Sequence, residues 1–370
     1  MRKHTRHSPT GSPRVAPGPR PALQRLLAVL LVAALAACGP GAPEPTPPPA
    51  LLPLDPQPTA RPVGPAPTVV AQGVTLPGRL LFVTGGDVWL WQADSGRALT
   101  NSGDAVQPAW SPDGTRIAYI RRGESYSDLM VLPMDGGEPL RLTNNGSQYP
   151  PHSYERIYDT IWAFYPAFSP DGKEIAFASQ YGPPFGQPAA EYHFSLYVMP
   201  ANAGGRRAQL YADDRGHVGR MVYTPDGTAI VFAYAPAAAG APQLYRYTRA
   251  SGVAEPLPGA PEQSYDPDFS PDGRWLAFAA RDGGRTDVFV MPATGGTPAR
   301  LTTLGAARAP AFAPDGSMLA FLAIAPGTNS FDLWVADLQL GPEGALRALH
   351  PRQITHDMRI DADSGLAWGP

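Results

Sequence analysis

The sequence predicts an all-β protein, a six-bladed β-propeller whose blades are four-stranded antiparallel sheets. One motif, an aromatic residue followed by Ser, Thr or Ala and then Pro-Asp-Gly, occurs five times. Its aspartates are 58, 55, 46 and 43 residues apart, and an apolar run follows each copy two residues later. The copies begin at Trp110, Phe168, Tyr223, Phe269 and Phe312. Self-similarity at a period of roughly 40 to 50 residues, built from short β-type runs and Gly/Pro turns, is typical of β-propellers.

Each repeat contains the four strands of one blade. The aromatic residue ends a first strand, and Pro-Asp-Gly suits a tight turn because Pro presets φ and Gly tolerates positive φ. The second strand is apolar at successive positions, as in Ile117–Ile120, so we expect both of its faces to be covered. A third strand such as Leu129–Leu132, a Gly-rich turn and a short outer strand such as 142–143 complete the unit.

The two ends of the propeller region predict how the ring closes. Leu80–Val83, Val88–Trp91 and residues 99–100 match second, third and fourth strands, with no first strand before them. Leu366–Pro370 matches Pro108–Pro112, which is a first strand. We therefore expect the C-terminal strand to join the N-terminal blade, which gives six blades and removes the open sheet edges of a partial ring.

The Ser-Pro-Asp-Gly units resemble those of the TolB-like six-bladed propellers, and related units occur in the propellers of prolyl oligopeptidase-type peptidases. The resemblance covers residues 78–370, for which it implies the propeller fold. The namesake of the family carries a small α/β domain ahead of its propeller and is soluble in the periplasm. In this chain a proline-rich segment occupies that place.

Residues 1–37 are predicted to be a lipoprotein signal peptide. They hold six basic residues and no acidic one, and end in a twelve-residue apolar stretch. Such a stretch is too short to span a bilayer but suits the core of a signal peptide. It runs into Cys38, the only cysteine of the chain, in a context that resembles the bacterial lipobox. A simple cleavage site beside a chance cysteine is the alternative. We expect Cys38 to be lipidated and to anchor an extracytoplasmic protein to the bacterial membrane.

Residues 38–77 are predicted to be a disordered tether between this anchor and the propeller at 78–370. Thirteen prolines and almost no charged residues lie in 39–77. Such a segment cannot bury a core and favours extended polyproline-like conformations.

Composition argues against several classes of function. Without residues 1–37, Lys plus Arg falls from 29 to 23 against 32 Asp plus Glu, so a nucleic-acid partner is not expected. The propeller contains no Gly-x-Ser-x-Gly nucleophile motif. No histidine pair has metal-ligand spacing and no second cysteine exists. We expect no metal, no cofactor, no enzymatic activity and a monomer.

The repeated aspartates all fall on one rim of the predicted ring. A ring of functional carboxylates is one interpretation. However, Asp before Gly in a hairpin turn already has a structural role, and we favour that role for Asp113, Asp171, Asp226, Asp272 and Asp315.

The opposite face is the better candidate for binding. The long connections 145–163 and 180–194 and the shorter 324–331 emerge there, and the first two are rich in aromatic residues. Such loops are typical of recognition surfaces, although the rings could instead pack the loops onto the blades. First strands start near the central channel, so the residues before them should surround its mouth. The candidate partner-binding residues are Gln107, Tyr158, Asp159, Tyr165, His217, Arg220, Tyr265, Asp266, Arg308 and Asp363.

These observations predict a membrane-tethered extracytoplasmic binding or scaffold protein that recognises a protein or cell-envelope partner through its long-loop face. One alternative is a propeller enzyme that acts on a polysaccharide at the channel mouth. Its candidate acid, base and cationic groups are His217, Arg220, Asp266, Arg308 and Asp363. A purely structural spacer is a third possibility, because a fold does not by itself define a function.

Overall fold

The computed structural model describes residues 69–70, 74–180, 193–236, 240–342 and 344–370. The predicted signal peptide, Cys38 and most of the predicted tether lie outside the described residues, as do Tyr181, Phe185 and Tyr192 of the long loops. The regular secondary structure of the described residues is β-strand, apart from one short 3-10 helix, η1 (Tyr154–Tyr158). Among them, no helix has the length and apolarity needed to cross a bilayer.

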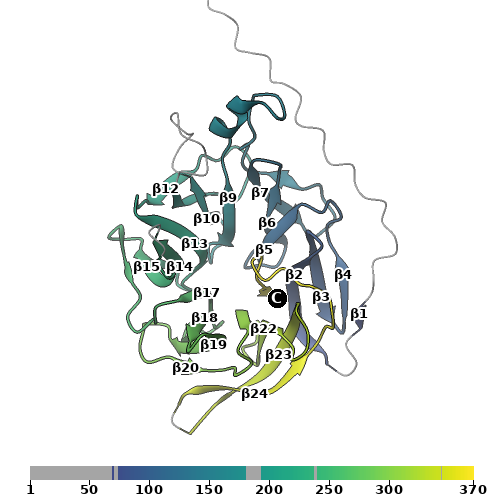
Figure 1. The fold of residues 1–370 in the computed structure, drawn as a ribbon, viewed down its shortest axis with the longest axis vertical. Helices are drawn as coiled ribbons and strands as arrows, with labels where there is room; N and C mark the ends of the chain where they lie inside the picture. The colour runs from purple at the N-terminus through teal and green to yellow at the C-terminus, as the bar shows by residue number, and fades with distance from the viewer. Residues whose placement is uncertain (1–68, 71–73, 181–192, 237–239, 343) are drawn as a thin grey trace, which may run out of the picture. The chain divides into compact units, whose positions relative to one another are not determined.

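Six antiparallel sheets surround a central axis, as predicted (Figure 1). We number them as blades 1 to 6 and give their strands from the innermost outwards. Blade 1 holds β5 (Ala105–Trp110), β6 (Arg116–Arg122), β7 (Ser127–Pro133) and β8 (Leu140–Arg141). Blade 2 holds β9 (Ala163–Phe168), β10 (Glu174–Gln180), β11 (Phe194–Pro200) and β12 (Ala208–Tyr211). Blade 3 holds β13 (Gly216–Tyr223), β14 (Ala229–Pro236), β15 (Gln243–Thr248) and β16 (Val253–Pro256).

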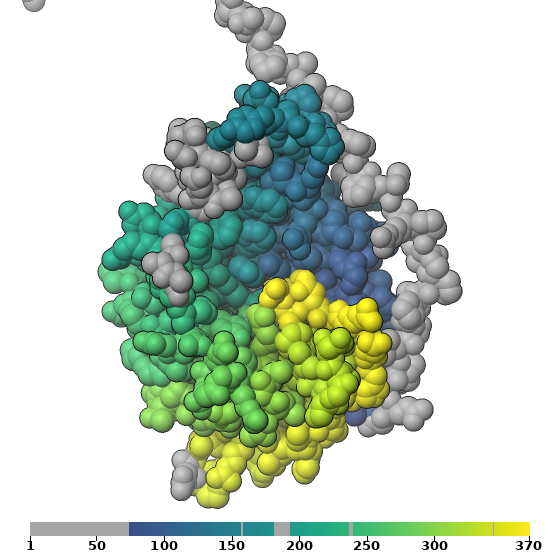
Figure 2. Space-filling view, in the orientation of Figure 1, coloured from purple at the N-terminus to yellow at the C-terminus, as the bar shows by residue number. Residues whose placement is uncertain are grey.

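The remaining blades follow the same order. Blade 4 holds β17 (Ser264–Phe269), β18 (Trp275–Asp282), β19 (Arg285–Pro292) and β20 (Ala299–Arg300). Blade 5 holds β21 (Ala307–Phe312), β22 (Met318–Ile324), β23 (Phe331–Leu340) and β24 (Leu346–Gln353). Blade 6 holds β25 (Ala367–Gly369), β2 (Leu76–Thr84), β3 (Asp87–Ala93), β4 (Ser95–Ala98) and β1 (Val69–Val70). Figure 2 shows the blades packed side by side in chain order, from blue through green to yellow.

The C-terminal strand closes the ring, which confirms the predicted closure. β25 pairs with β2, with Trp368 opposite Leu80, and the chain ends beside β2 near the centre of the ring (Figure 1). The indole Nε1 of Trp368 donates a hydrogen bond to the carbonyl of Pro77 at 2.6 Å. Blade 6 also has a fifth, outermost strand, β1, which pairs with β4. The sequence analysis did not anticipate this strand.

The second strand of each blade forms the core, as its uninterrupted apolar pattern predicts. Its central aromatic ring is completely buried in five blades, at Phe82, Phe177, Phe232, Phe278 and Phe321. The residue before this ring is small in most blades and equally buried, as at Ala176 and Ala320. Large and small side chains therefore alternate along the strand, and neighbouring sheets can approach closely.

The innermost strands share a β-bulge that shapes the channel mouth. The pairing register shifts within β5, β9, β13, β17 and β21. Four equivalent residues at the bulge have positive φ, namely Gln107, Tyr165, Asp266 and Ala309, and Gly365 has positive φ at the corresponding position ahead of β25. Positive φ is uncommon for residues other than glycine, and bulges often re-aim side chains beside functional sites.

The bulges also correct the predicted strand starts. Gln107, Tyr165, Arg220, Asp266 and Arg308 were expected to precede the first strands but lie within them. Pairing continues on both sides of each bulge, so the strands begin earlier than the hydrophobic pattern indicates.

Candidate functional site

A pocket of about 410 Å³ opens at the channel mouth on the long-loop face. Strands of blades 2 to 5 and the segment before β25 form its walls. Seven predicted binding residues line it: Tyr165, His217, Arg220, Tyr265, Asp266, Arg308 and Asp363. The structure therefore brings together, around one cavity, residues that are up to 198 positions apart in the sequence.

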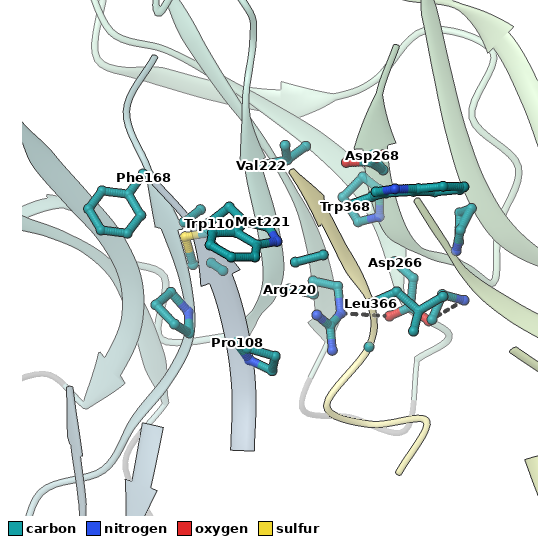
Figure 3. Close-up of a pocket in the computed structure, with 18 residues that line it drawn as sticks. Pro108, Trp110, Phe168, Arg220, Met221, Val222, Asp266, Asp268, Leu366 and Trp368 are labelled. Carbon is teal, nitrogen blue, oxygen red and sulfur yellow. Dashed lines mark hydrogen bonds and ion pairs between the residues drawn. The ribbon is translucent and has the colours of Figure 1, made fainter. Parts of the chain in front are cut away.

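Asp266 is the centre of a charged cluster at this mouth. It is only 4% exposed, and its two carboxylate oxygens accept from Arg220 Nε at 3.1 Å and from Arg308 Nε at 2.9 Å. Figure 3 shows the first of these contacts. Burial alone would raise the pKa of Asp266, but the guanidinium groups of Arg308 and Arg220 outweigh it and hold that pKa below its ordinary value. Asp266 is therefore ionised at neutral pH.

Asp363 ties the two arginines together on the solvent side. Its carboxylate accepts from Arg308 Nη1 at 2.7 Å, and its backbone carbonyl accepts from Arg220 Nη2 at 2.7 Å. The Asp363 side chain is 80% exposed, so its carboxylate lies at the solvent end of this cluster.

Aromatic rings support both arginines from beneath. The guanidinium of Arg220 lies 5.3 Å from the centre of the Tyr165 ring, and that of Arg308 lies 5.1 Å from the centre of the Tyr265 ring. Such cation–π contacts orient a guanidinium and contribute roughly 0.5–2 kcal/mol each. Burial also raises the pKa of Tyr165, so its hydroxyl stays protonated. The mouth thus presents charged groups in fixed orientations.

Two histidines stack beside the pocket. The rings of His193 and His217 lie 4.8 Å apart at an angle of 15°. The backbone N–H of Phe194 donates to His217 Nδ1 at 3.2 Å, so this nitrogen acts as an acceptor. Burial and then the neighbouring His193 lower the pKa of His217, which favours its neutral form at neutral pH. His217 therefore adds an aromatic surface and no charge.

The pocket also contains aromatic residues that the sequence analysis missed. Phe164 and Phe194 line it, with their ring centres 5.2 Å apart in an edge-to-face arrangement. Phe164 directly precedes Tyr165 in an inner strand, which was an available signal. Phe194 starts a third strand, and no sequence feature distinguishes it from the strand residues of other blades.

Three predicted binding residues do not line the pocket. Gln107 lies beside it, where its side-chain oxygen accepts from the backbone N–H of Tyr165 at 2.8 Å. Asp159 accepts from Ser147 Oγ at 3.1 Å and from the backbone N–H of Gln148, within its own loop.

Tyr158 is the third of these residues. Its hydroxyl bonds the hydroxyl of Tyr154 within η1, and Tyr154 is 71% exposed. Tyr149 on the same loop is 40% exposed, whereas Arg156 is buried and donates to Ser125 Oγ and the Tyr149 carbonyl. Some rings of this loop therefore face solvent, while the loop is held by contacts of its own residues.

The turn aspartates make the hydrogen bonds expected of structural residues. Asp113 Oδ1 accepts from Ser111 Oγ at 2.6 Å and from the backbone N–H of Thr115 at 3.0 Å. These contacts, the Ser111 bond first, lower the pKa of Asp113 to about 2. The same pattern recurs at Asp171, Asp226 and Asp272. Asp315 accepts from the backbone N–H and the hydroxyl of Ser317, and it lacks the bond from the residue two before it because Ala313 replaces the hydroxyl residue.

The charge state of Asp266 limits the chemistry that it can perform. Asp266 is ionised and held by two arginines, so it does not suit the role of a general acid. No group of three or more His, Cys, Asp or Glu side chains that could hold a metal ion occurs in the described part of the chain.

Known proteins share the propeller. A family model described as the TolB beta propeller domain matches residues 159–339. The chain is 26% identical over 242 residues to the Tol-Pal system protein TolB of Francisella tularensis subsp. mediasiatica, covering 61% of this chain and 47% of that protein. It is 26% identical over 217 residues to a Bacillus subtilis protein named uncharacterized peptidase YuxL. This match covers 55% of this chain and 27% of that protein. The crystal structure of TolB from Acinetobacter baumannii matches with a TM-score of 0.58 and 22% identity, covering 79% of this chain and 67% of that one.

The chain thus contains a six-bladed propeller that is TolB-like, and the TolB beta propeller domain model matches it over residues 159–339. The chain spans less than half the length of the two curated relatives described above. The likeness to the Acinetobacter structure concerns the fold alone.

Proposed function

We propose that this protein is a membrane-tethered, extracytoplasmic binding or scaffold protein whose propeller recognises a protein partner in the cell envelope. The observation that carries the proposal is the convergence of Arg220, Tyr265, Asp266 and Arg308 around one pocket at the channel mouth. The TolB relative, named as a Tol-Pal system protein, supports an envelope role.

The chemistry of the mouth suits a protein ligand. Binding hot spots are enriched in Tyr and Arg that line well-packed pockets. Here the pocket of about 410 Å³ can hold an anchoring side chain, while the exposed Asp363 carboxylate and the two arginine heads supply hydrogen bonds around it. Because the charges already compensate one another, the mouth discriminates by geometry more than by net charge.

The binding face can be tested with matched variants. A partner is first captured by crosslinking in membranes, with the propeller as bait, and its affinity for purified propeller is then measured. Arg220→Ala and Tyr265→Ala are expected to weaken binding by roughly tenfold or more each, as hot-spot residues do. Asp113→Asn and Asp272→Asn, on the opposite rim, are the controls and should bind like the wild type.

Two outcomes would contradict the proposal. Loss of binding confined to the Asp113 and Asp272 variants, with folding intact, would place the site on the other face. Consumption of a polysaccharide by purified propeller, abolished by Asp266→Asn or His217→Ala, would replace the binding function with the enzymatic one.

The proposed anchor has its own test. Metabolic labelling with a fatty-acid analogue is expected to label the wild-type protein and not Cys38→Ala, because Cys38 is the only thiol available for acylation. A single lipid chain gives marginal membrane binding, so stable anchoring needs the multiple acylation of a bacterial lipoprotein. Equal labelling of both proteins would contradict the lipoprotein assignment.

A further inference from the structure

A second cavity lies inside the channel, and it overlaps the mouth pocket only in part. It has a volume of about 190 Å³, and residues from all six innermost strands line it (Figure 3). It shares Arg220 and Asp266 with the mouth pocket, and these two are paired with each other. The only other ionisable residue in its lining is Asp268.

Asp268 breaks the pattern of the inner strands. Each innermost strand places one residue at the position directly before its final aromatic ring. The other five residues at this position are small or apolar: Ala109, Ala167, Val222, Ala311 and Ala367. The propeller fold therefore does not require a carboxylate at this position of the inner strand.

The carboxylate of Asp268 has no cationic partner among the described residues. It accepts hydrogen bonds from the backbone N–H of Phe312 at 2.8 Å and from that of Phe269. The nearby arginines are committed to Asp266, two residues earlier. Asp268 is only partly buried and is open to the cavity, and desolvation by the protein packed around it raises its pKa to about 7. Forming a charge there costs free energy unless a cation arrives to compensate it.

The walls of the cavity suit an organic cation. Trp110, Phe168 and Trp368 line it together with Asp268, and aromatic rings attract cations through their faces. Trp110 already has the guanidinium of Arg79 over its ring, 4.4 Å from the centre. A hard divalent metal ion instead takes six or more oxygen ligands. The side chains of this lining supply one uncompensated carboxylate and are otherwise mostly apolar, although more than half of its exposed surface is polar.

We propose that the central channel binds a small organic cation, an alkylammonium group, with the Asp268 carboxylate as its counter-ion and the rings of Trp110 and Trp368 as its walls. A volume of about 190 Å³ admits a short alkyl chain with an ammonium head. This proposal for the channel does not depend on the protein partner proposed for the mouth pocket.

Calorimetric titration with n-butylammonium at neutral pH tests the site. The wild-type propeller should bind the amine saturably and should not bind n-butanol, its neutral counterpart. Asp268→Asn should weaken binding by roughly tenfold to 100-fold, the range of a charge-assisted hydrogen bond. This amide keeps an oxygen for the Phe312 N–H and nearly the same volume. Asp272→Asn, on the adjacent turn of the same blade, is the matched control and should bind normally.

A second measurement uses the wild-type protein alone. Because the pKa of Asp268 is about 7, about half of the carboxyl groups hold a proton at pH 7, and the ammonium should displace it. Carbon NMR of the Asp268 carboxyl should therefore show its pKa fall when the amine is added.

Three results would overturn the proposal. They are equal binding by the wild type and Asp268→Asn, an unchanged carboxyl pKa in the presence of the amine, or displacement of the amine by calcium at lower concentration. The last result would make the cavity a metal site.

Discussion

Deletion of residues 365–370 is expected to lower the free energy of unfolding by about 3–5 kcal/mol, the scale of losing a large buried side chain. The deletion removes β25, the innermost strand of blade 6, and exposes the edge of β2. It also removes Trp368, which packs against the apolar cluster of blades 5 and 6 and bonds Pro77. A typical domain is stable by only ~5–15 kcal/mol, so the melting temperature should fall sharply. Thermal and urea unfolding followed by circular dichroism measure the effect.

A surface substitution provides the control for this deletion. Leu340 ends β23 and is 48% exposed, so Leu340→Ser should change stability by no more than about 0.5 kcal/mol. Trp368→Ala should fall between the control and the deletion, because the backbone pairing of β25 with β2 survives. An unchanged melting temperature after the deletion would show that β25 does not hold the ring closed.

The sequence alone predicted the blade architecture because each blade repeats the same local physics. The Pro-Asp-Gly turn requires Asp as an acceptor and Gly at positive φ, as at Asp113 and Gly114, so the motif recurs in register. Ring closure was predictable because residues 80–100 match the second, third and fourth strands of a blade without a first strand, and residues 366–370 match a first strand alone. β1 was not predictable, since two valines form no periodic pattern.

Another repeated contact was overlooked. In four blades an Asp near the start of the third strand accepts a hydrogen bond from a Thr two residues after the end of the outer strand. The pairs are Asp87 with Thr100, Asp128 with Thr143, Asp287 with Thr302 and Asp332 with Thr355. Blades 2 and 3 have Ser195 and Gln243 in place of the Asp, and these two blades provide much of the mouth pocket. A departure from an internal repeat was therefore a signal for the site.

The candidate site was predictable only where topology decides it. The inner strands of a propeller converge on its axis. Tyr165, Arg220 and Asp266 therefore lie around one pocket regardless of the conformation of the loops. Tyr158 and Asp159 are held away by hydrogen bonds within their own loop, which no strand pattern reveals. Asp268 was missed because the Asp-Pro-Asp sequence at 266–268 resembles a turn. Only the bulge between Tyr265 and Asp268, which the sequence does not reveal, shows that Asp268 lies in the strand.

Replacing Asp266 by Asn is expected to destabilise the propeller by about 3 kcal/mol, because breaking a buried ion pair leaves its partners uncompensated. Arg220 and Arg308 have side chains only 16% and 21% exposed, so water compensates them poorly. Asn tolerates the positive φ of 53° at this position, and the substitution thus isolates charge from backbone strain. Asp363→Asn is the matched control. Its side chain is 80% exposed, so stability should change by less than about 1 kcal/mol.

The pH dependence distinguishes this charge effect from a packing defect. The pKa of Asp266 is lower in the folded protein than its ordinary value of 3.8, so its ionised form stabilises the fold. That contribution is fully present above the unfolded pKa and is lost as pH falls through the lower folded pKa. The difference in stability between wild type and Asp266→Asn should therefore be constant from neutral pH down to about pH 5 and shrink below pH 4. Urea unfolding across this range measures it. A difference that persists unchanged into acid would mean that Asp266 acts through its shape and not through its charge.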